Sequence, residues 1–508
     1  MELFFLSSTF LLVFLSLLSL LYLSLKNEDP KKKSTMYGMK PYPILGYVPH
    51  FIKNRHRVLD WCTEIIIRSP THTMGFATFG GHGGVITANP KNVEHIVKTN
   101  FNNYPKGELM IFMLVDFFGH GIFNSDGEQW LWQRKAASLE FSKRSLRNFV
   151  ISTVQTEIVN RFLPLLNKLE QINQTIDLQD MLERFAVDNI CNVAFGEDPA
   201  CLTEDGYVGE KSKFMKDFGE AQEITLARFM NPLRFVWRVK KFLNIGSERR
   251  LKELISTVHG YTMNIVKAKK ERALIDQKQD LLSRFSSNND CSDESLCDVV
   301  TNFILAGRET TSSALTWFFW LVSTKPNVEE KIIEEIKSVR IKKQVTSEVF
   351  DYDDLREMNY LHAAITESMR LYPPVAMDSA TCKEEDILPD GTHVGKGWFI
   401  SYCAYAMGRI EDIWGNDCNE FKPERWLENG IFKPESPFKY PVFHGGPRMC
   451  LGKEMAYIQM KSIAACVFER FKFKVVGKEG TPETLLSFTL RMKGGLPIQL
   501  SKRENIDQ

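Results

Sequence analysis

The chain has 508 residues, which is enough for an extensive buried core. Lys plus Arg number 64 against 63 for Asp plus Glu, so the net charge of +1 gives no reason to expect a nucleic-acid partner. The ten cysteines include no Cys-x-x-Cys pair and no spacing typical of a disulfide framework, so a reducing, cytosol-facing environment fits them best.

Residues 3–25 carry no charge and are rich in Leu and Phe. As a helix rising ~1.5 Å per residue, these 23 residues span about 34 Å, enough to cross a bilayer core. A cleaved signal peptide is the alternative, but it would have a shorter apolar region, a basic start and a small-residue cleavage site. Residues 1–25 are therefore predicted to form an uncleaved transmembrane anchor.

A basic and proline-rich linker is predicted at residues 26–50. Four lysines closely follow the anchor, and by the positive-inside rule they place the rest of the chain on the cytosolic side. Pro41, Pro43 and Pro49 then make a stiff elbow between the membrane and the globular body.

The globular body begins with a helix and a small sheet. Residues 73–88 alternate around a glycine cluster and predict a strand hairpin; a phosphate-binding loop is the alternative, but no Gly-Lys-Ser/Thr sequence follows. Residues 126–135 open a helix on which Trp130 and Arg134 share a face, a spacing that also fits an ordinary cation–π pair. Residues 153–298 are mostly amphipathic helix.

A long apolar run at residues 298–324 has the hydropathy of a second membrane span. Arg308 and Glu309 lie near its middle, however, and two charges at bilayer depth would cost several kcal/mol. We therefore predict a buried helix that crosses a soluble core.

Glu367 and Arg370 are three residues apart on a predicted helix, where an exposed pair would contribute about 0.2–0.5 kcal/mol. The sequence Pro-Asp-Gly at 389–391 marks a hairpin turn between two strands, and residues 488–500 predict another hairpin around two glycines. A mostly helical body with small β-sheets is expected.

A loop containing two glycines and a proline, followed by an amphipathic run, surrounds Cys450. The cysteine should therefore lie just ahead of a helix N-terminus, where free backbone N–H groups and the helix dipole favour a thiolate. Arg448 adds positive charge. A thiolate in such a site is either a nucleophile or a metal ligand.

The loop reads Phe-x-x-Gly-x-Arg-x-Cys-x-Gly, and at every fixed position it resembles the haem-binding loop of the cytochrome P-450 superfamily, the haem-thiolate monooxygenases. The resemblance implies a mainly α fold with small β-sheets, the cytochrome P-450 fold, in a single catalytic body at residues 51–508 behind the N-terminal transmembrane anchor. The implied cofactor is haem b, with Cys450 as the axial ligand of its iron. The implied cofactor-binding residues of this loop are Phe443, Gly446, Arg448, Cys450 and Gly452.

Residues 306–311 resemble the distal helix of the same family. The resemblance implies that Gly307 leaves room over the iron for dioxygen. Thr310 would hydrogen-bond either the helix backbone or an oxygen of the bound dioxygen, and Glu309 would help to relay protons from solvent.

Two further patterns resemble the family. Trp130 and Arg134 have the spacing of a helix that contacts a haem propionate, so both are assigned to the cofactor. Glu367, Arg370 and Arg425 would form a buried network behind the haem as structural support rather than as chemistry.

The implied electron donor is a separate membrane-bound NADPH–haemoprotein reductase, since nothing in the chain resembles a flavin or nicotinamide domain. The implied location is the endoplasmic reticulum membrane, as a single-pass protein with a cytosolic catalytic domain. Candidates for a basic docking face are Arg134, Lys135, Lys143, Arg144 and Lys453, although a solvated charged face is the commoner explanation for such residues.

Several stretches resemble the plant microsomal branch that contains fatty-acid ω-hydroxylases and jasmonate–amino-acid oxidases. They are residues 85–90, 101–107, 371–375 and 438–457. We therefore expect hydroxylation of the terminal carbon of an apolar lipid, with a fatty acid first, a sterol side chain second and a jasmonate conjugate third.

The substrate is expected to contact an apolar, adaptable loop at residues 110–118. Between 106 and 122, Lys106 is the only permanent cation, so this loop offers no arginine to a carboxylate. A neutral sterol would need none, whereas Arg228, Arg234 or Arg238 could hold an acid.

Two other classes stay open at this point. Reductase-independent haem enzymes that rearrange lipid hydroperoxides commonly lack the distal threonine and the anchor, both of which the sequence has. A non-enzymatic haem-binding membrane protein would not need the intact relay and ligand motifs.

Overall fold

A computed structural model of the chain describes residues 39–42, 45–77, 83–139, 141, 151–203, 210–231, 235–273, 280–286, 291–477 and 480–503. The predicted anchor, most of the predicted linker, and Lys143, Arg144 and Arg234 lie outside these ranges. Within these ranges, no helix combines the length and the apolar character that crossing a membrane requires.

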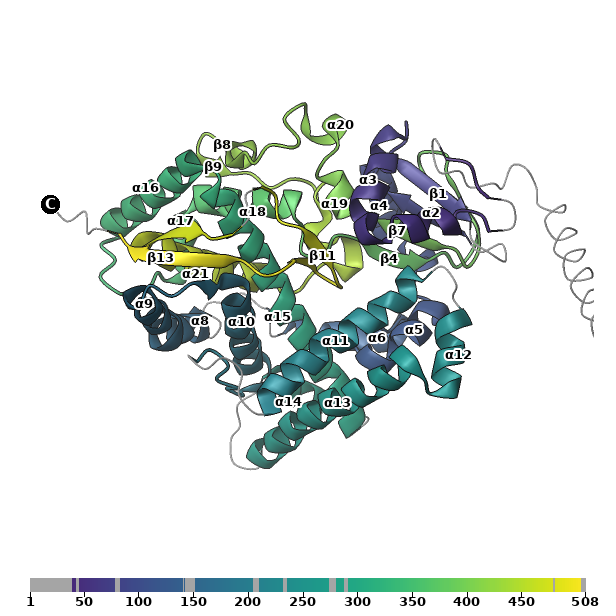
Figure 1. Cartoon of the computed structure of the whole chain (residues 1–508), viewed down its shortest axis with the longest axis horizontal. Helices are drawn as coiled ribbons and strands as arrows, with labels where there is room; N and C mark the ends of the chain where they lie inside the picture. Colours follow the sequence, from purple (N-terminus) through teal and green to yellow (C-terminus); the bar gives the residue numbers. More distant parts are fainter. Residues whose placement is uncertain are drawn as a thin grey trace, which may run out of the picture.

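The described part of the chain is mainly helical with small sheets, as predicted, and its longest helix runs through the middle of the helical region (Figure 1). The α-helices are α2 (Val48–Lys53), α3 (Val58–Arg68), α4 (Pro90–Glu94), α5 (Glu108–Phe118), α6 (Gly127–Ser138), α8 (Ile151–Glu157), α9 (Leu163–Gln171), α10 (Leu178–Phe195), α11 (Glu210–Met230), α12 (Phe235–Leu243), α13 (Gly246–Ala273), α14 (Leu281–Ser286), α15 (Asp293–Ser323), α16 (Pro326–Lys343), α17 (Tyr352–Glu357), α18 (Asn359–Leu371), α19 (Ala404–Met407), α20 (Glu411–Trp414) and α21 (Lys453–Arg470).

Helix α15 is the buried helix predicted at residues 298–324. The Ser292 side chain caps its N-terminus by accepting a hydrogen bond from the Ser295 backbone N–H, and two acidic residues in its first turn complement the helix dipole. It packs against α10, α13, α18 and α21, so it is surrounded by protein over most of its length. A soluble core therefore accounts for its apolar run.

Within the described residues, the strands form one sheet of four, one of three and three of two. They are β1 (Thr73–Ala77), β2 (Gly83–Thr87), β3 (Ile176–Asp177), β4 (Asp378–Thr381), β5 (Asp386–Ile387), β6 (His393–Val394), β7 (Phe399–Tyr402), β8 (Leu427–Glu428), β9 (Ile431–Phe432), β10 (Phe471–Val475), β11 (Thr484–Leu486), β12 (Leu490–Met492) and β13 (Pro497–Lys502). In the four-stranded sheet, order β1-β2-β7-β4, only β2 and β7 pair in parallel.

Two of the three predicted hairpins are confirmed. Strands β1 and β2 pair antiparallel, as do β5 and β6 on either side of the turn at 389–391. The hairpin predicted at 488–500 is wrong: β12 pairs with β11, whereas β13 pairs with β10 and β3. Gly494 and Gly495 both have positive φ, and a Cβ at Gly495 would lie 2.1 Å from Asp177, so the two glycines redirect the chain from one sheet to another.

A single large cluster of buried apolar side chains extends from the first described helices to β13. A smaller cluster lies at the four-stranded sheet, where Val85, Ile400 and Tyr104 pack together. Figure 1 shows this sheet, with α2, α3 and α4, at one side of the helical region. Strands β4 and β7 of the sheet supply one wall of the candidate site.

Candidate active site

Cys450 lies between the short helix η9 (Gly446–Arg448) and helix α21. Its backbone N–H donates to the Phe443 carbonyl oxygen at 2.9 Å and closes the loop. Gly446 has a φ of 63°, and a Cβ there would lie 1.9 Å from the Val97 carbonyl oxygen, so the loop can approach this neighbour only with glycine. The prediction that Cys450 precedes a helix N-terminus is confirmed.

The Cys450 thiol differs from the other nine. Cys450 is exposed, whereas eight of the others are buried and one is half-buried. Desolvation by the surrounding protein nevertheless raises the pKa of Cys450, while the Gly452 and Lys453 N–H groups and the charges of Arg134 and Lys453 act to lower it. The predicted positive field is present, but Arg134 and Lys453 supply it rather than Arg448, and it does not outweigh the effect of burial on the pKa. Since a bound metal ion deprotonates a coordinating thiol, this sulfur suits a metal ligand better than a free thiolate.

Helix α6 confirms the predicted helix that carries Trp130 and Arg134, but these two side chains do not form the cation–π pair that their spacing also allowed. The Arg134 guanidinium donates to the Met449 carbonyl oxygen, next to Cys450. The Trp130 ring is instead covered by Arg448, whose guanidinium carbon lies 4.5 Å from its centroid. Arg448 also donates to Asp126 Oδ1 at 2.7 Å. Both predicted residues of α6 therefore meet the cysteine loop.

Helix α15 has one accessible window. Between residues 299 and 319, only Ala306, Gly307 and Thr310 are not buried, and their spacing puts them on one face. Thr310 Oγ1 donates to the Ala306 carbonyl oxygen at 2.7 Å, which is the hydrogen bond to the helix backbone that the sequence predicted as one of two alternatives. The half-buried Thr310 hydroxyl is therefore held by the helix backbone on one side and is accessible on the other.

The window lies close to the cysteine loop. The ring of Phe141 stacks on Phe303 of α15 with centroids 6.4 Å apart, and Phe303 is one turn before Gly307 on the same face. A Cβ built at Gly452 would lie 3.7 Å from Phe141 and 3.9 Å from Cys450 Sγ. A side chain at Gly452 would therefore make only ordinary van der Waals contacts. The backbone N–H of Gly452 donates a hydrogen bond to the Cys450 sulfur.

Two residues of α15 have structural contacts in addition to their predicted roles, which stay predictions. A Cβ at Gly307 would lie 2.5 Å from the Ile190 side chain, so this glycine lets α10 and α15 pack closely; clearance for dioxygen stays a prediction. Glu309 is 1% exposed, and its two carboxylate oxygens accept from Gln222 at 2.8 Å and Thr489 at 2.9 Å. This arrangement gives Glu309 no direct contact with solvent, so a relay from solvent would require one of these bonds to open.

Glu367, Arg370 and Arg425 form the predicted buried network. Glu367 and Arg370 are 0% and 1% exposed and make two hydrogen bonds of 2.7 and 2.8 Å. Arg425 and the Trp426 indole also donate to Glu367, at 3.3 and 2.8 Å. The network ties α18 to the segment that follows α20, far more firmly than an exposed pair on one helix would.

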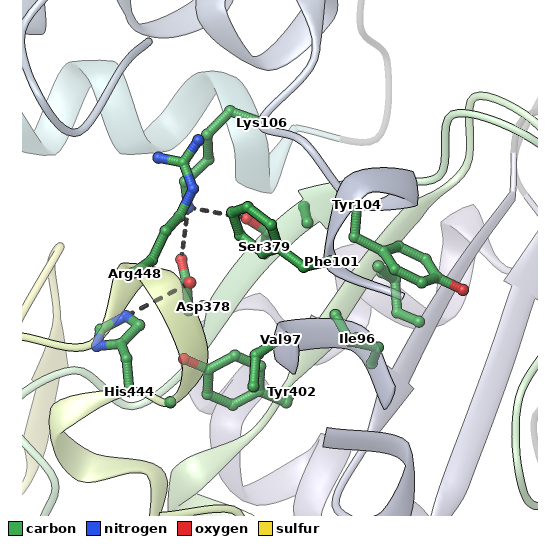
Figure 2. A pocket seen from close by; sticks show the side chains of 13 residues that line it. Ile96, Val97, Phe101, Tyr104, Lys106, Asp378, Ser379, Tyr402, His444 and Arg448 are labelled. Carbon is green, nitrogen blue, oxygen red and sulfur yellow. Dashed lines mark hydrogen bonds and ion pairs between the residues drawn. The ribbon is translucent and has the colours of Figure 1, made fainter. Parts of the chain in front are cut away.

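A pocket beside the cysteine loop has mostly apolar walls, to which Lys106, Arg448, His444, Asp378 and two buried tyrosines, Tyr104 and Tyr402, also contribute (Figure 2). Lys106 Nζ lies 2.9 Å from Asp378 Oδ1, and His444 Nε2 lies 3.4 Å from Asp378 Oδ2. Arg448 lines the same pocket. The Tyr402 hydroxyl is buried and has no hydrogen-bond partner within the described ranges.

The substrate-contacting loop predicted at 110–118 is helix α5, which begins after Gly107 (φ 78°) and ends before Gly119 (φ 55°). The run between them contains no glycine or proline, so it continues as helix. Most of its Met, Leu and Phe side chains are buried, and the helix packs against α15.

The predicted carboxylate-holding cations have different surroundings. Arg228 is 2% exposed and is paired with Glu248 and Asp116, so it is already neutralised. Arg238 is exposed, lies 5.7 Å from the Phe112 ring, and has no carboxylate partner in the described part of the chain. Of the cations considered, Arg238 is therefore the one available to an acid.

Sequence reasoning missed four groups of the site. Gln222, Thr489 and Tyr402 are far along the chain from the motifs that they contact, and no local pattern marks them. Asp378 lies in a stretch that departs from the expected family pattern, which was the only signal for it.

The sequence profile of the family described as Cytochrome P450 matches residues 36–498. The protein belongs to this family of haem-thiolate monooxygenases. Among its members, it is 49% identical to Cytochrome P450 CYP94D108 of Paris polyphylla over 460 residues, which are 90% of this chain and 91% of that protein. It is 44% identical to Cytochrome P450 94A1 of Vicia sativa over 92% of this chain and 91% of that protein, and 43% identical to Cytochrome P450 94B3 of Arabidopsis thaliana over 98% and 99%. The chain is thus a plant-type monooxygenase of the CYP94 family.

The cofactor of this family is haem held by a cysteine thiolate. The residues present fit that group: one exposed thiol lies among N–H donors, and the adjacent pocket holds the partnerless Tyr402 hydroxyl beside two cations that are paired with carboxylates of the chain.

Proposed function

We propose that the protein hydroxylates the terminal carbon of a long apolar lipid, with a fatty acid as the first candidate substrate. Dioxygen is the co-substrate, and electrons come from NADPH through a separate reductase. The observation that carries the proposal is the window formed by Ala306, Gly307 and Thr310 on α15, where every other residue between 299 and 319 is buried. Helix α5 packs against this helix and contributes apolar side chains.

In this proposal, Cys450 would hold the haem iron through its sulfur. Haem, when bound, supplies the activation of dioxygen that hydroxylates an unactivated C–H bond. The Cys450 sulfur would hold the iron and donate electron density to it, and Arg448, Arg134 and Trp130 would hold the cofactor's carboxylates. Thr310 holds a proton at Oγ1 within the window, and Glu309 is the buried acid behind it.

The charges around the site bear on the substrate. Lys106 and Arg228 are both paired with carboxylates of the chain, which favours a neutral lipid such as a sterol side chain as the second candidate. Arg238 is the available anchor for the carboxylate of a fatty acid or of a jasmonate conjugate, the third candidate.

The test is turnover by the full-length protein with NADPH and reductase on a long-chain fatty acid, a sterol and a jasmonate–amino-acid conjugate. We expect a terminally hydroxylated fatty acid, and products oxidised only on ring carbons would contradict all three candidates. Arg238→Gln should raise KM for the acid and leave KM for the sterol unchanged. Arg249→Gln, at a 68% exposed site, is the matched control.

The ligand assignment has its own test. Cys450→Ala should abolish the carbon-monoxide difference spectrum of a haem-thiolate and abolish turnover. Retention of an unaltered spectrum and full turnover would overturn the assignment and the proposed function with it.

We also propose that the protein is held in the endoplasmic reticulum membrane by residues 1–25, with the catalytic body in the cytosol. Among the residues of the predicted docking face that the structure describes, Lys135 is exposed and Lys453 is half-buried. Arg134 is directed to the Met449 carbonyl oxygen, so it serves the cysteine loop rather than a partner.

A further inference from the structure

The pocket beside the cysteine loop contains a carboxylate where a carboxylate ligand is expected to bind. Asp378 is the first residue of β4, and its register partner on β7 is Tyr402. Figure 2 shows Asp378 between Lys106 and His444, with Arg448 and Tyr402 lining the same space. Each of the two donors next to Asp378 is therefore already engaged.

Asp378 is firmly ionised in this position. Burial opposes ionisation, but Lys106 and His444 together lower the pKa of the Asp378 carboxyl well below its usual range. Lys106 makes a second bond, to the Ser379 carbonyl oxygen at 3.0 Å, so its ammonium group is held on two sides.

The permanent charges of this region already cancel. Lys106 is balanced by Asp378, and Arg448 is balanced by Asp126 at 2.7 Å. A further carboxylate in the pocket therefore adds an uncompensated negative charge close to Asp378, where like charges in a partly buried space repel. The Tyr402 hydroxyl is the one buried donor lining the pocket that has no partner within the described ranges.

We propose that Asp378 competes with a carboxylate of the haem for the same two donors, Lys106 and His444. Asp378 holds these donors in position but shares them with the cofactor. As a result, it weakens the retention of haem and lowers the reduction potential of the haem iron. The haem carboxylate accepts a hydrogen bond from the Tyr402 hydroxyl, which is the one donor that it does not share with Asp378. Asp378 is a positioning residue, since it acts on the cofactor through Lys106, His444 and its own charge. The inference rests on the haem-binding part of the proposed function and is independent of the substrate.

The experiment uses the haem-loaded full-length protein. Haem release is measured as transfer to excess apomyoglobin, and the reduction potential is measured by spectroelectrochemistry. Asp378→Asn keeps the shape of the side chain and removes its charge, so haem release should become about tenfold slower and the potential should rise. Asp378→Glu, which keeps the charge, should show neither change.

Two further variants separate this role from a structural one. Asp412→Asn removes the same charge from a side chain that is 80% exposed, and it should leave release and potential unchanged. Tyr402→Phe deletes the unshared donor without changing the packing, so haem release should become several-fold faster.

Release that is equally fast or faster in Asp378→Asn would overturn the proposal, because a merely structural carboxylate would loosen the pocket when it is replaced. An unchanged release rate in Tyr402→Phe would show that no carboxylate occupies the pocket and would overturn it by a separate route. Loss of terminal hydroxylation with this release pattern intact would refute the substrate assignment alone.

Discussion

Glu367 shows how much one buried residue can carry in this fold. Its carboxylate accepts from Arg370, Arg425, Trp426 and the Lys422 backbone N–H, all within 3.3 Å. A buried charge is tolerated only where its partners replace the lost water, and removal of one partner leaves the others desolvated.

Glu367→Gln should therefore destabilise the protein by about 3–5 kcal/mol, because the buried Arg370 guanidinium loses its counter-charge and the half-buried Arg425 keeps only Asp417. The measurement is urea unfolding followed by circular dichroism, together with the haem content of purified protein. Glu428→Gln, which removes a 64% exposed partner of Lys433, should cost less than about 1 kcal/mol. Equal losses in the two variants would show that the Glu367 network is not a stabilising core.

Thr310 permits a matched test of function at the residue scale. Thr310 and Thr316 each donate to the carbonyl oxygen four residues earlier on α15, at 2.7 Å, but Thr310 is half-buried in the window whereas Thr316 is 0% exposed. The backbone bond is common to both, and only the open side differs.

Thr310→Val should lower the yield of product per NADPH consumed and raise hydrogen peroxide release, since the window loses its proton-holding hydroxyl. Thr316→Val should leave this ratio unchanged and cost about 1 kcal/mol of stability. Product and peroxide are quantified in the same reaction with reductase. A similar ratio in both variants would remove Thr310 from the proposed proton path.

At the scale of elements, the contact between α10 and α15 depends on one missing Cβ. A side chain at Gly307 would meet Ile190 at 2.5 Å, below any ordinary carbon–carbon contact. The absence of a side chain at Gly307 therefore allows the two helices to pack closely at the level of the window.

Gly307→Ala should destabilise the protein by about 1–3 kcal/mol through overpacking, and Ile190→Ala should partly rescue it in the double variant. On α13, Gly260 has no atom within 4 Å of the position of an added Cβ, so Gly260→Ala should stabilise the protein by up to about 1 kcal/mol. Thermal unfolding of the four variants checks both signs. Independent effects of Gly307→Ala and Ile190→Ala would contradict a direct clash.

The elements that the sequence predicted well are those specified by local pattern. The buried helix around Arg308, the helix of Trp130 and the hairpin of β1 and β2 all follow from periodicity and turn residues. Helix α5 was predicted as a loop, because its apolar face gave no polar side by which helical periodicity could be recognised. The error at 488–500 has a different cause: the pairing of β12 with β11 and of β13 with β10 is decided by contacts between distant segments.

At the scale of the whole molecule, the candidate site also divides into residues that lie in local motifs and residues that come together only through folding. Cys450, Arg448, Glu367 and Arg370 lie in compact motifs, so their positions could be anticipated from the sequence. The partners of Glu309 come from residues 222 and 489, and those of Asp378 come from residues 106 and 444. Such groups become neighbours only after the chain has folded, and single-sequence periodicity contains no information about them.

Electron supply belongs to the scale of the whole molecule, because it depends on a surface rather than on the pocket. Lys135 is exposed on α6, and the preceding residue, Arg134, contacts the loop that holds Cys450. An acidic reductase surface that docks here would reach the cysteine side of the site directly. Attraction between exposed charges is screened within about 10 Å at 0.1 M salt, so its contribution should depend on ionic strength.

Lys135→Glu should slow the first reduction of the haem by the reductase several-fold at low salt, and the difference should disappear at high salt. The rate is measured by stopped-flow formation of the carbon-monoxide complex. Lys396→Glu makes the same charge change at a 68% exposed site in the turn between β6 and β7, and it should leave the rate unchanged. If both variants slow reduction equally, net charge rather than a docking face controls the encounter, and the basic face of α6 loses its assigned role.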